Sequence, residues 1–413
     1  MATSKLRSIS SSLISLTFHR IYHTSRRARR SLYAKISPLG SPALSVRPEL
    51  DCWIDKGKKV SVAELQRIVR DFRKRKRFSH ALEVLEWMKE RGIMDFSASE
   101  HAVKLDLIGK INGYVDAENY FQGLPDQDKT DKTYGALLNC YVRQRETEKS
   151  LSLFHKMREM GFASSTITYN DLMCLYTYTD RHDKVPEVLA EMKQNGVKPD
   201  NYSYRICINS FGVRSDIKGM EKILKEMEIQ PHIAMDWNTY AVAAHIYIKA
   251  SLTAKAIDAL KKAEVRLDEE KDGESYNFLI SLYSKLGNTD EVLRLWKLEK
   301  GACNRCINRD YINVLKALVR LGELEKARTI LKEWEASCNS HDPRVPDVLI
   351  AAYWGNGLFE KAKEVIEELA SKGKACSPKW KSLVEKGSME QVDIEEALDD
   401  ESEARSLMEE KVF

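Results

Sequence analysis

The chain has 413 residues, of which 43% are hydrophobic and 31% are charged, and its formal net charge is +4. A chain of this length and composition can bury a large core, which excludes a disordered or collagen-like protein. No run approaches the roughly 18 consecutive apolar residues that cross a bilayer, so we expect no membrane insertion.

The first 36 residues are basic and rich in serine. Nine Lys and Arg residues, but no Asp or Glu, precede Glu49, and hydroxyl side chains alternate with Leu, Ile and Phe. This composition is typical of an organellar transit peptide, which we predict over residues 1–36. The density of arginine favours the mitochondrion (matrix) over the chloroplast. A basic arm that contacts nucleic acid is the alternative interpretation.

Residues 37–61 are predicted to form a linker with a short lead-in helix, and a periodic region follows. A tyrosine recurs every 35 or 36 residues, at Tyr134, Tyr169, Tyr204, Tyr240, Tyr276 and Tyr311. Most of these have an aromatic partner seven residues later, which places two rings on one face of a helix, two turns apart.

Glycines at the same spacing, Gly287, Gly322 and Gly357, predict the turn at which this helix ends. A second amphipathic stretch follows each turn, as in FEKAKEVIEELASKG. Each repeat is therefore predicted to be a helical hairpin whose apolar faces are covered by the neighbouring repeats.

The period predicts an all-α fold, an α-solenoid of about nine 35-residue helix-turn-helix repeats. The predicted repeats span residues 62–96, 98–130, 131–165, 166–200, 201–236, 237–272, 273–307, 308–342 and 343–377. The first and last are the least regular, as expected at the ends of a solenoid. Residues 378–413 are predicted to form a C-terminal capping helix and an acidic tail, because 11 acidic and only 3 basic residues occur from Glu385 onwards.

One repeat carries a family signature. The segment Thr166 to Asp200, TITYNDLMCLYTYTDRHDKVPEVLAEMKQNGVKPD, closely resembles the pentatricopeptide repeat, and the uniform repeat length resembles the P class of plant organellar proteins. This resemblance implies a right-handed superhelix whose first helices line a groove that binds single-stranded RNA, with about one base read per repeat. It also implies a protein without an appended catalytic domain.

The resemblance assigns base reading to the fifth and the last residue of a repeat. It implies Asn170 with Asp200 as a pair that favours uracil, and it places Arg205, Asp236 and Asn277 at further reading positions. Most pairs other than Asn170 with Asp200 depart from the family's reading combinations. This departure leaves open a second function, a protein-interaction scaffold associated, for example, with the mitochondrial ribosome.

Six repeats carry a basic residue at one shared position, the end of the first helix. These residues are Lys74, Lys110, Arg143, Lys249, Lys285 and Arg320. Because the repeat fixes their orientation, we predict that they form one line that tracks an RNA phosphate backbone. Compensation of the helix dipole is the alternative. The basic run from Arg67 to Phe78 could clamp an RNA end or could be a solvated helix face.

The remaining motifs predict neither a metal nor catalysis. Cys303, Cys306, Cys338 and His341 are zinc ligands in type, but a whole repeat separates the two pairs, so we expect no metal and no cofactor. No Gly-rich phosphate loop or deaminase motif is present, so the chain is not expected to be an enzyme. The predicted protein is a monomer that acts on organellar mRNA, in its stability, processing or translation, with ribosomal or RNA-processing proteins as further partners.

Overall fold

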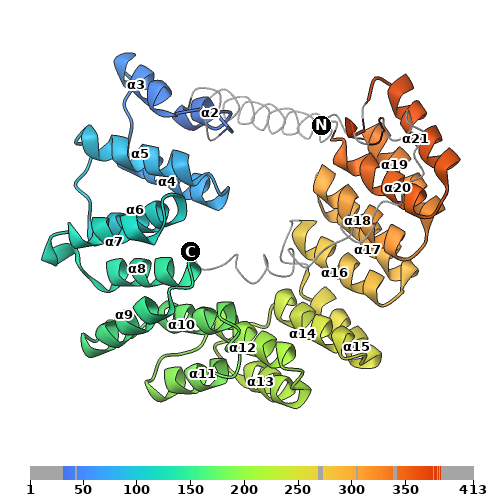
Figure 1. Cartoon of the computed structure of the whole chain (residues 1–413). Helices are drawn as coiled ribbons and strands as arrows, with labels where there is room; N and C mark the ends of the chain where they lie inside the picture. The colour runs from blue at the N-terminus through green and yellow to red at the C-terminus, as the bar shows by residue number, and fades with distance from the viewer. Residues whose placement is uncertain are drawn as a thin grey trace, which may run out of the picture. The chain divides into compact units, whose positions relative to one another are not determined.

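The structure is a computed structural model that describes residues 31–41, 44–267, 273–303, 306–337, 342–374, 376–378, 380 and 382. Helices account for all of the regular secondary structure in these ranges (Figure 1). The chain divides into an N-terminal unit, up to Thr179, and a C-terminal unit, from Asp180. The prediction of an all-α fold is confirmed.

The N-terminal unit contains two lead-in helices and then pairs of longer helices. Its helices are α2 (Leu32–Ile36), α3 (Arg47–Asp55), α4 (Val62–Lys74), α5 (Phe78–Glu90), α6 (Ala98–Ile111), α7 (Tyr114–Gln122), η1 (Asp126–Asp128), α8 (Asp131–Arg143), α9 (Thr147–Glu159) and α10 (Thr166–Tyr178).

The C-terminal unit continues the same alternation. Its helices are α11 (Val185–Gln194), α12 (Asn201–Val213), α13 (Ile217–Ile229), α14 (Trp237–Lys249), α15 (Thr253–Glu264), α16 (Gly273–Lys285), α17 (Thr289–Ala302), α18 (Asn308–Arg320), α19 (Leu324–Ser337), α20 (Arg344–Gly355) and α21 (Phe359–Ser371).

Within each unit, successive repeats stack through their first helices. Contacts join α6 to α8 and α8 to α10 in the N-terminal unit, and α12, α14, α16, α18 and α20 follow one another in the C-terminal unit. The first helices of the first eight repeats begin at the residues where the sequence register begins each repeat, and α20 begins one residue after Pro343. This stacking confirms a solenoid of helical hairpins, while the right-handed superhelix stays a prediction.

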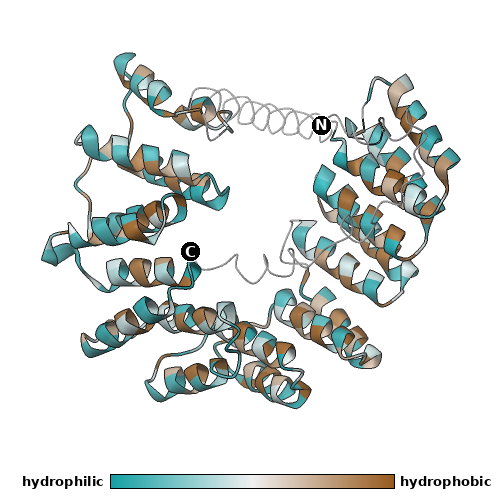
Figure 2. Cartoon of the chain, in the orientation of Figure 1, coloured by the Kyte–Doolittle hydropathy of each residue, from teal (hydrophilic) through white to brown (hydrophobic). Residues whose placement is uncertain are grey.

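The helices are held together by apolar faces and by close approaches of small residues. The repeat helices in Figure 2 carry both hydrophobic and hydrophilic residues, as an amphipathic element must. The recurrent tyrosines are buried, and Ala327 and Ala362 are fully buried on α19 and α21. A Cβ on Gly109 of α6 would lie 2.3 Å from the Cys140 sulfur of α8, so only glycine allows these two helices to approach so closely.

Buried tyrosine rings also link repeats through their hydroxyl groups. Tyr247 donates to Glu221 at 3.1 Å, and Glu221 also accepts from Lys255 at 2.6 Å. The same arrangement recurs in the next repeat, where Tyr283 donates to Glu264 at 2.6 Å and Arg294 donates to the same carboxylate at 2.5 Å. These triads satisfy the phenol of a buried ring and pair the charges of successive second helices.

The first helix of each repeat ends on a residue in the left-handed region of backbone space. The predicted glycines Gly287, Gly322 and Gly357 have φ of 74°, 73° and 72°. The residue after each donates its N–H back across the last turn, as Leu358 does to Tyr353 at 2.8 Å, which is the hydrogen bond of a Schellman motif. The glycine prediction is therefore confirmed.

Five other repeats make the same turn without glycine. Their residues with positive φ are Lys76, Arg145, Asp180, Ser215 and Ser251. For a residue with a Cβ, this conformation raises the free energy of the folded state by roughly 1 kcal/mol, because the Cβ crowds the following carbonyl oxygen. These turns therefore hold strain that the three glycine turns avoid.

Replacement of Ser251 by glycine is expected to stabilise the protein by about 0.5–1 kcal/mol, because φ at this position is 58°. The matched control is Ser152→Gly in the exposed face of α9, which should destabilise by a similar amount. Urea unfolding of both variants measures the difference. A Ser251→Gly variant that is no more stable than wild type would show that this turn is unstrained.

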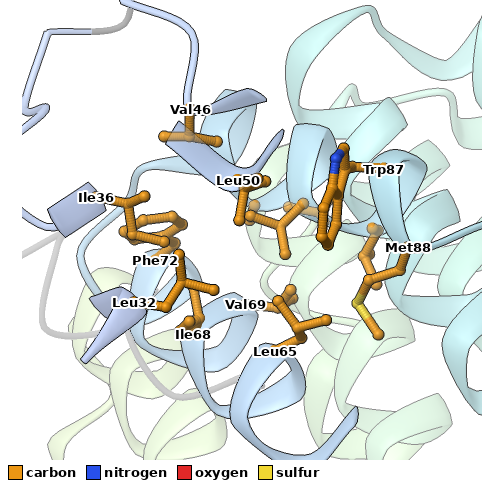
Figure 3. Close-up of a cluster of buried hydrophobic side chains, with 14 residues drawn as sticks. Leu32, Ile36, Val46, Leu50, Leu65, Ile68, Val69, Phe72, Trp87 and Met88 are labelled. Carbon is orange, nitrogen blue, oxygen red and sulfur yellow. The ribbon is translucent and has the colours of Figure 1, made fainter. Parts of the chain in front are cut away.

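The lead-in helices are part of the core of the first repeat. Leu32 and Ile36 of α2 are fully buried, and Figure 3 shows them facing Ile68 and Phe72 of α4. Tyr33 donates to Asp71 at 2.5 Å. The segment predicted to be removed, residues 1–36, thus includes the whole of α2. Its residues 1–30 lie outside the described residues.

The other end of the chain is described only in part. Trp380 is buried and its ring lies 6.3 Å from that of Trp354. The predicted acidic tail lies outside the described residues. None of the described helices has the length and apolar character that crossing a membrane requires.

Candidate functional site

The six predicted backbone contacts all lie in the last turn of a first helix. They close α4, α6, α8, α14, α16 and α18, in that order. A first helix of constant length places this position at the same end of every hairpin. What differs between the two units is the set of groups around these cations.

In the N-terminal unit, two of these residues converge on a buried carboxylate, Asp106 of α6. The Lys110 ammonium lies 2.9 Å from Asp106 Oδ2, and Arg143 Nη2 lies 3.7 Å from Oδ1. Arg73 of α4 also reaches Oδ2, at 3.3 Å. Three successive first helices are therefore joined through one side chain that is 1% exposed.

The electrostatics of this cluster are dominated by positive charge. Burial lowers the pKa of Lys110, the Asp106 carboxylate opposes this change, and the guanidinium groups of Arg143 and Arg73 lower the pKa further. The nearby Asp171 carboxyl is buried, which raises its pKa to about 7. Part of the negative charge that could balance the cations is thus neutralised near pH 7.

In the C-terminal unit, the charges of Lys249 and Lys285 both act on His245 of α14. Burial lowers the pKa of His245 to about 4, and the charges of Lys285 and Lys249 contribute to this shift. The imidazole is therefore neutral near pH 7, and its buried Nδ1 has no hydrogen-bond partner among the described residues. Arg320 donates to the hydroxyl of Ser284, the residue before Lys285, at 2.9 Å.

Two predicted base-reading residues, Arg205 and Asp236, bind each other. Arg205 Nη1 lies 2.7 Å from Asp236 Oδ2, and the Asn201 amide donates to the same oxygen at 3.1 Å. Burial acts to raise the pKa of Asp236, but the charge of Arg205 and the hydrogen bonds from Thr239 outweigh it, so the pKa is lowered. The pair is therefore satisfied within the protein.

The other predicted reading residues are also used inside the fold. Asn277 is 6% exposed, and its side-chain amide donates to Asp310 at 2.8 Å. Its backbone carbonyl oxygen accepts a hydrogen bond from the side chain of Asn313 at 2.8 Å. Asp200 caps α12 by accepting from the Ser203 amide at 2.8 Å. Asn170 is buried on α10 of the N-terminal unit. Their role in base reading stays a prediction.

A buried pair of carboxyl groups, Glu299 and Asp310, was not expected from the sequence. Glu299 on α17 is fully buried, and neither of its carboxyl oxygens has a hydrogen-bond partner in the part of the chain that the structure describes. A Cβ on Gly273 would lie 2.6 Å from Glu299 Oε1 and 3.3 Å from Asp310 Oδ1, so both carboxyl groups border the same space. Burial and then the charge of Asp310 raise the pKa of Glu299 to about 8.

The zinc-like residues are described only in part. Cys303 and Cys306 are partly buried thiols, whereas Cys338 and His341 lie outside the described residues. Among the residues that the structure does describe, no three His, Cys, Asp or Glu side chains are grouped so as to hold a metal ion. Cys140, Cys174 and Cys207 are buried on first helices and form no disulfide within the described part of the chain.

Some of these residues carried a readable signal in the sequence. Asp106 precedes Lys110 by four residues, which is the spacing of an ion pair on a helix. A comparison of basic residues alone between repeats does not reveal this aspartate. Glu299 follows Val292, Leu295 and Trp296 at helical spacing, which places it on an apolar face. His245 offers no such signal.

Comparison with known proteins agrees with the repeat register. A model of the PPR repeat family matches residues 164–213, and a model of the PPR repeat matches residues 132–162, 274–298 and 347–373. In structure, the pentatricopeptide repeat protein PPR10 from maize matches 88% of this chain and 61% of its own, with 16% identity and a TM-score of 0.44.

Two relatives from Arabidopsis thaliana are similar over most of their length. Both are named mitochondrial pentatricopeptide repeat-containing proteins. One is 55% identical over 93% of this chain and 78% of its own. The other is 37% identical over 83% of this chain and 70% of its own. The predicted mitochondrial localisation is confirmed by these relatives, and the chain belongs to the pentatricopeptide repeat family.

Proposed function

We propose that this protein binds single-stranded organellar RNA along its first helices, chiefly through the phosphate backbone, and so acts in the stability, processing or translation of a mitochondrial transcript. The observation that carries the proposal is the grouping of cations from neighbouring repeats. Lys110 and Arg143 both reach Asp106, and, besides burial, the charges of Lys249 and Lys285 both lower the pKa of His245. In this proposal the protein acts as a monomer and without catalysis.

Binding of a phosphate chain explains the arrangement of these cations better than compensation of the helix dipole does. Dipole compensation needs one cation at each helix end, and such charges need not approach those of the next helix. Here Arg73, Lys110 and Arg143 of three consecutive first helices meet at the single carboxylate of Asp106, so their mutual repulsion is offset only in part. An extended polyanion that runs across the repeats would relieve this repulsion.

A protein-interaction scaffold is the second candidate function. It is favoured by the closure of the reading positions, because Arg205 binds Asp236 and Asn277 binds Asp310. A groove whose base-reading side chains are engaged in this way would not select a sequence. Ribosomal or RNA-processing proteins are the partners that this alternative implies.

Titration of a fluorescent single-stranded RNA at several salt concentrations separates the two candidates. Phosphate binding predicts that the logarithm of the association constant falls steeply with the logarithm of salt concentration, by about 0.7 for each phosphate contact. Replacement of Lys249 and Lys285 by glutamine should reduce this slope by about 1.4 for every RNA sequence. The control is Lys218→Gln with Lys222→Gln, two exposed lysines of α13. Weak binding without a salt dependence would support the scaffold instead.

A further inference from the structure

The exposed face of α4 carries a row of three cations. Arg67, Arg70 and Lys74 are exposed and lie at spacings of three and four residues, which places them on one side of the helix. None of the three forms an ion pair within the described ranges. The acidic residue nearest to them in the helix, Asp71, is engaged by Tyr33 and by Arg75 at 2.8 Å.

The charged surfaces of the second helices show the usual arrangement. Lys149 lies 2.7 Å from Glu118, and Lys255 lies 2.6 Å from Glu221. Each of these two lysines is paired with a glutamate of the preceding repeat. Unpaired arginines side by side repel one another, so a helix face that holds two of them and a lysine is suited to a polyanionic ligand rather than to solvent alone.

The face of α4 continues into the cluster around Asp106. Arg73 follows Arg70 on α4 and reaches Asp106, where Lys110 and Arg143 also converge. The side chain of Arg143 is 28% exposed, so its guanidinium is open in part to a phosphate that approaches from outside.

We propose that these residues form one basic anchor for the phosphodiester backbone of RNA: Arg67, Arg70 and Lys74 on the exposed face of α4, with Arg73, Lys110 and Arg143 gathered around Asp106. This inference rests on the proposed function and adds to it a location. The anchor supplies a large share of the salt-dependent affinity and has no preference for base. Asp106 is a positioning residue, since it holds three cationic side chains from three helices at one point.

The first test replaces Arg67 and Arg70 by glutamine and measures RNA affinity against salt. Both side chains are exposed and outside the core, so the variant should keep the fold of the wild type. We expect the salt slope to fall by about 1.4 and the affinity near 0.1 M salt to fall roughly 10- to 30-fold. The loss should be equal for uridine-rich and mixed sequences. The control is again Lys218→Gln with Lys222→Gln.

The second test is Asp106→Asn, with circular dichroism and thermal unfolding to determine the folded fraction. A positioning role predicts a reduced salt slope for the folded protein, because the three cations no longer meet at one point. A purely structural role would lower the melting temperature and leave the slope of the folded fraction unchanged, which would overturn the positioning assignment.

The outcomes separate this inference from the proposed function. If the wild type shows no salt-dependent RNA binding, the proposed function fails. If the wild type binds with a steep slope but Arg67→Gln with Arg70→Gln matches the α13 control, the anchor is wrong and the proposed function stands. A loss that depends on base sequence would also contradict the anchor.

Discussion

A chain that begins at Ser37 is expected to be less stable in its first repeat, by roughly 3–6 kcal/mol, than a chain that begins at Ser31. The longer chain keeps α2, whose Leu32 and Ile36 are fully buried against α4. Each of these side chains contributes about 1.5–3 kcal/mol when it leaves water. Loss of α2 would also expose Ile68 and Phe72 of α4.

Native-state hydrogen exchange of the α4 and α5 amides measures this difference in each truncated protein. The full-length variant with Leu32→Ala and Ile36→Ala is the matched control, because it removes the same contacts without shortening the chain. Equal protection in the chains that begin at Ser31 and Ser37 would show that α2 does not stabilise the first repeat. The burial of α2 leads us to expect that a removable segment ends before Ser31, not at residue 36.

Replacement of Glu299 by glutamine is expected to stabilise the C-terminal unit at pH 8 and to have little effect near pH 4.5. In the folded protein burial, and then Asp310, raise the pKa of Glu299 to about 8, from an ordinary value of 4.5, while the charge of Arg309 opposes the shift. The folded state therefore holds a proton that the unfolded state releases between these two pH values.

The sign of the effect follows from this difference in bound protons. Between about pH 4.5 and 8 the folded state binds more protons at Glu299, so this group makes the unfolding free energy fall as pH rises, by up to about 1.4 kcal/mol per pH unit. Below and above this window its contribution is constant. Glutamine carries no proton to lose, so the variant lacks this decline, and the gain at pH 8 is on the order of 3–4 kcal/mol.

Hydrogen exchange of α17 and α18 at several pH values tests the prediction, with wild type and variant compared at each pH. The control is Glu360→Gln, because the Glu360 side chain is 84% exposed. Parallel pH profiles for the wild type and Glu299→Gln would show that Glu299 is not protonated in the folded state near neutral pH.

The repeat architecture could be predicted from the sequence because its signals are local and periodic. Tyr134 to Tyr311 recur with the repeat, and Gly287, Gly322 and Gly357 mark the turn between helices. A hairpin of constant length then determines where Lys110 or Lys249 lies, because each occupies the same turn of its own helix. The shared position of the six cations at the ends of first helices was predictable for the same reason, while their alignment in one line stays a prediction.

The partners of these side chains could not be predicted in the same way, since they come from neighbouring repeats. Arg205 was assigned to base reading from its position in the repeat. Its contact with Asp236 depends on how the last residue of that repeat lies against the first helix of the same repeat. The spacing of Glu299 places it on an apolar helix face, but it does not indicate which residue of another helix covers the carboxyl group. Gly273 approaches it so closely that a Cβ there would lie 2.6 Å from Glu299 Oε1.

The turns between helices differ along the chain in whether the residue with positive φ is a glycine. The last three repeats bend at glycine, whereas Lys76, Arg145 and Ser215 bend with a Cβ in an unfavourable conformation. In a solenoid each hairpin contacts only its neighbours, so strain in one turn affects the stability of that hairpin and of the adjacent ones only. Each of the five turns without glycine is therefore a separate place at which a single glycine substitution would relieve strain without a change in the rest of the protein.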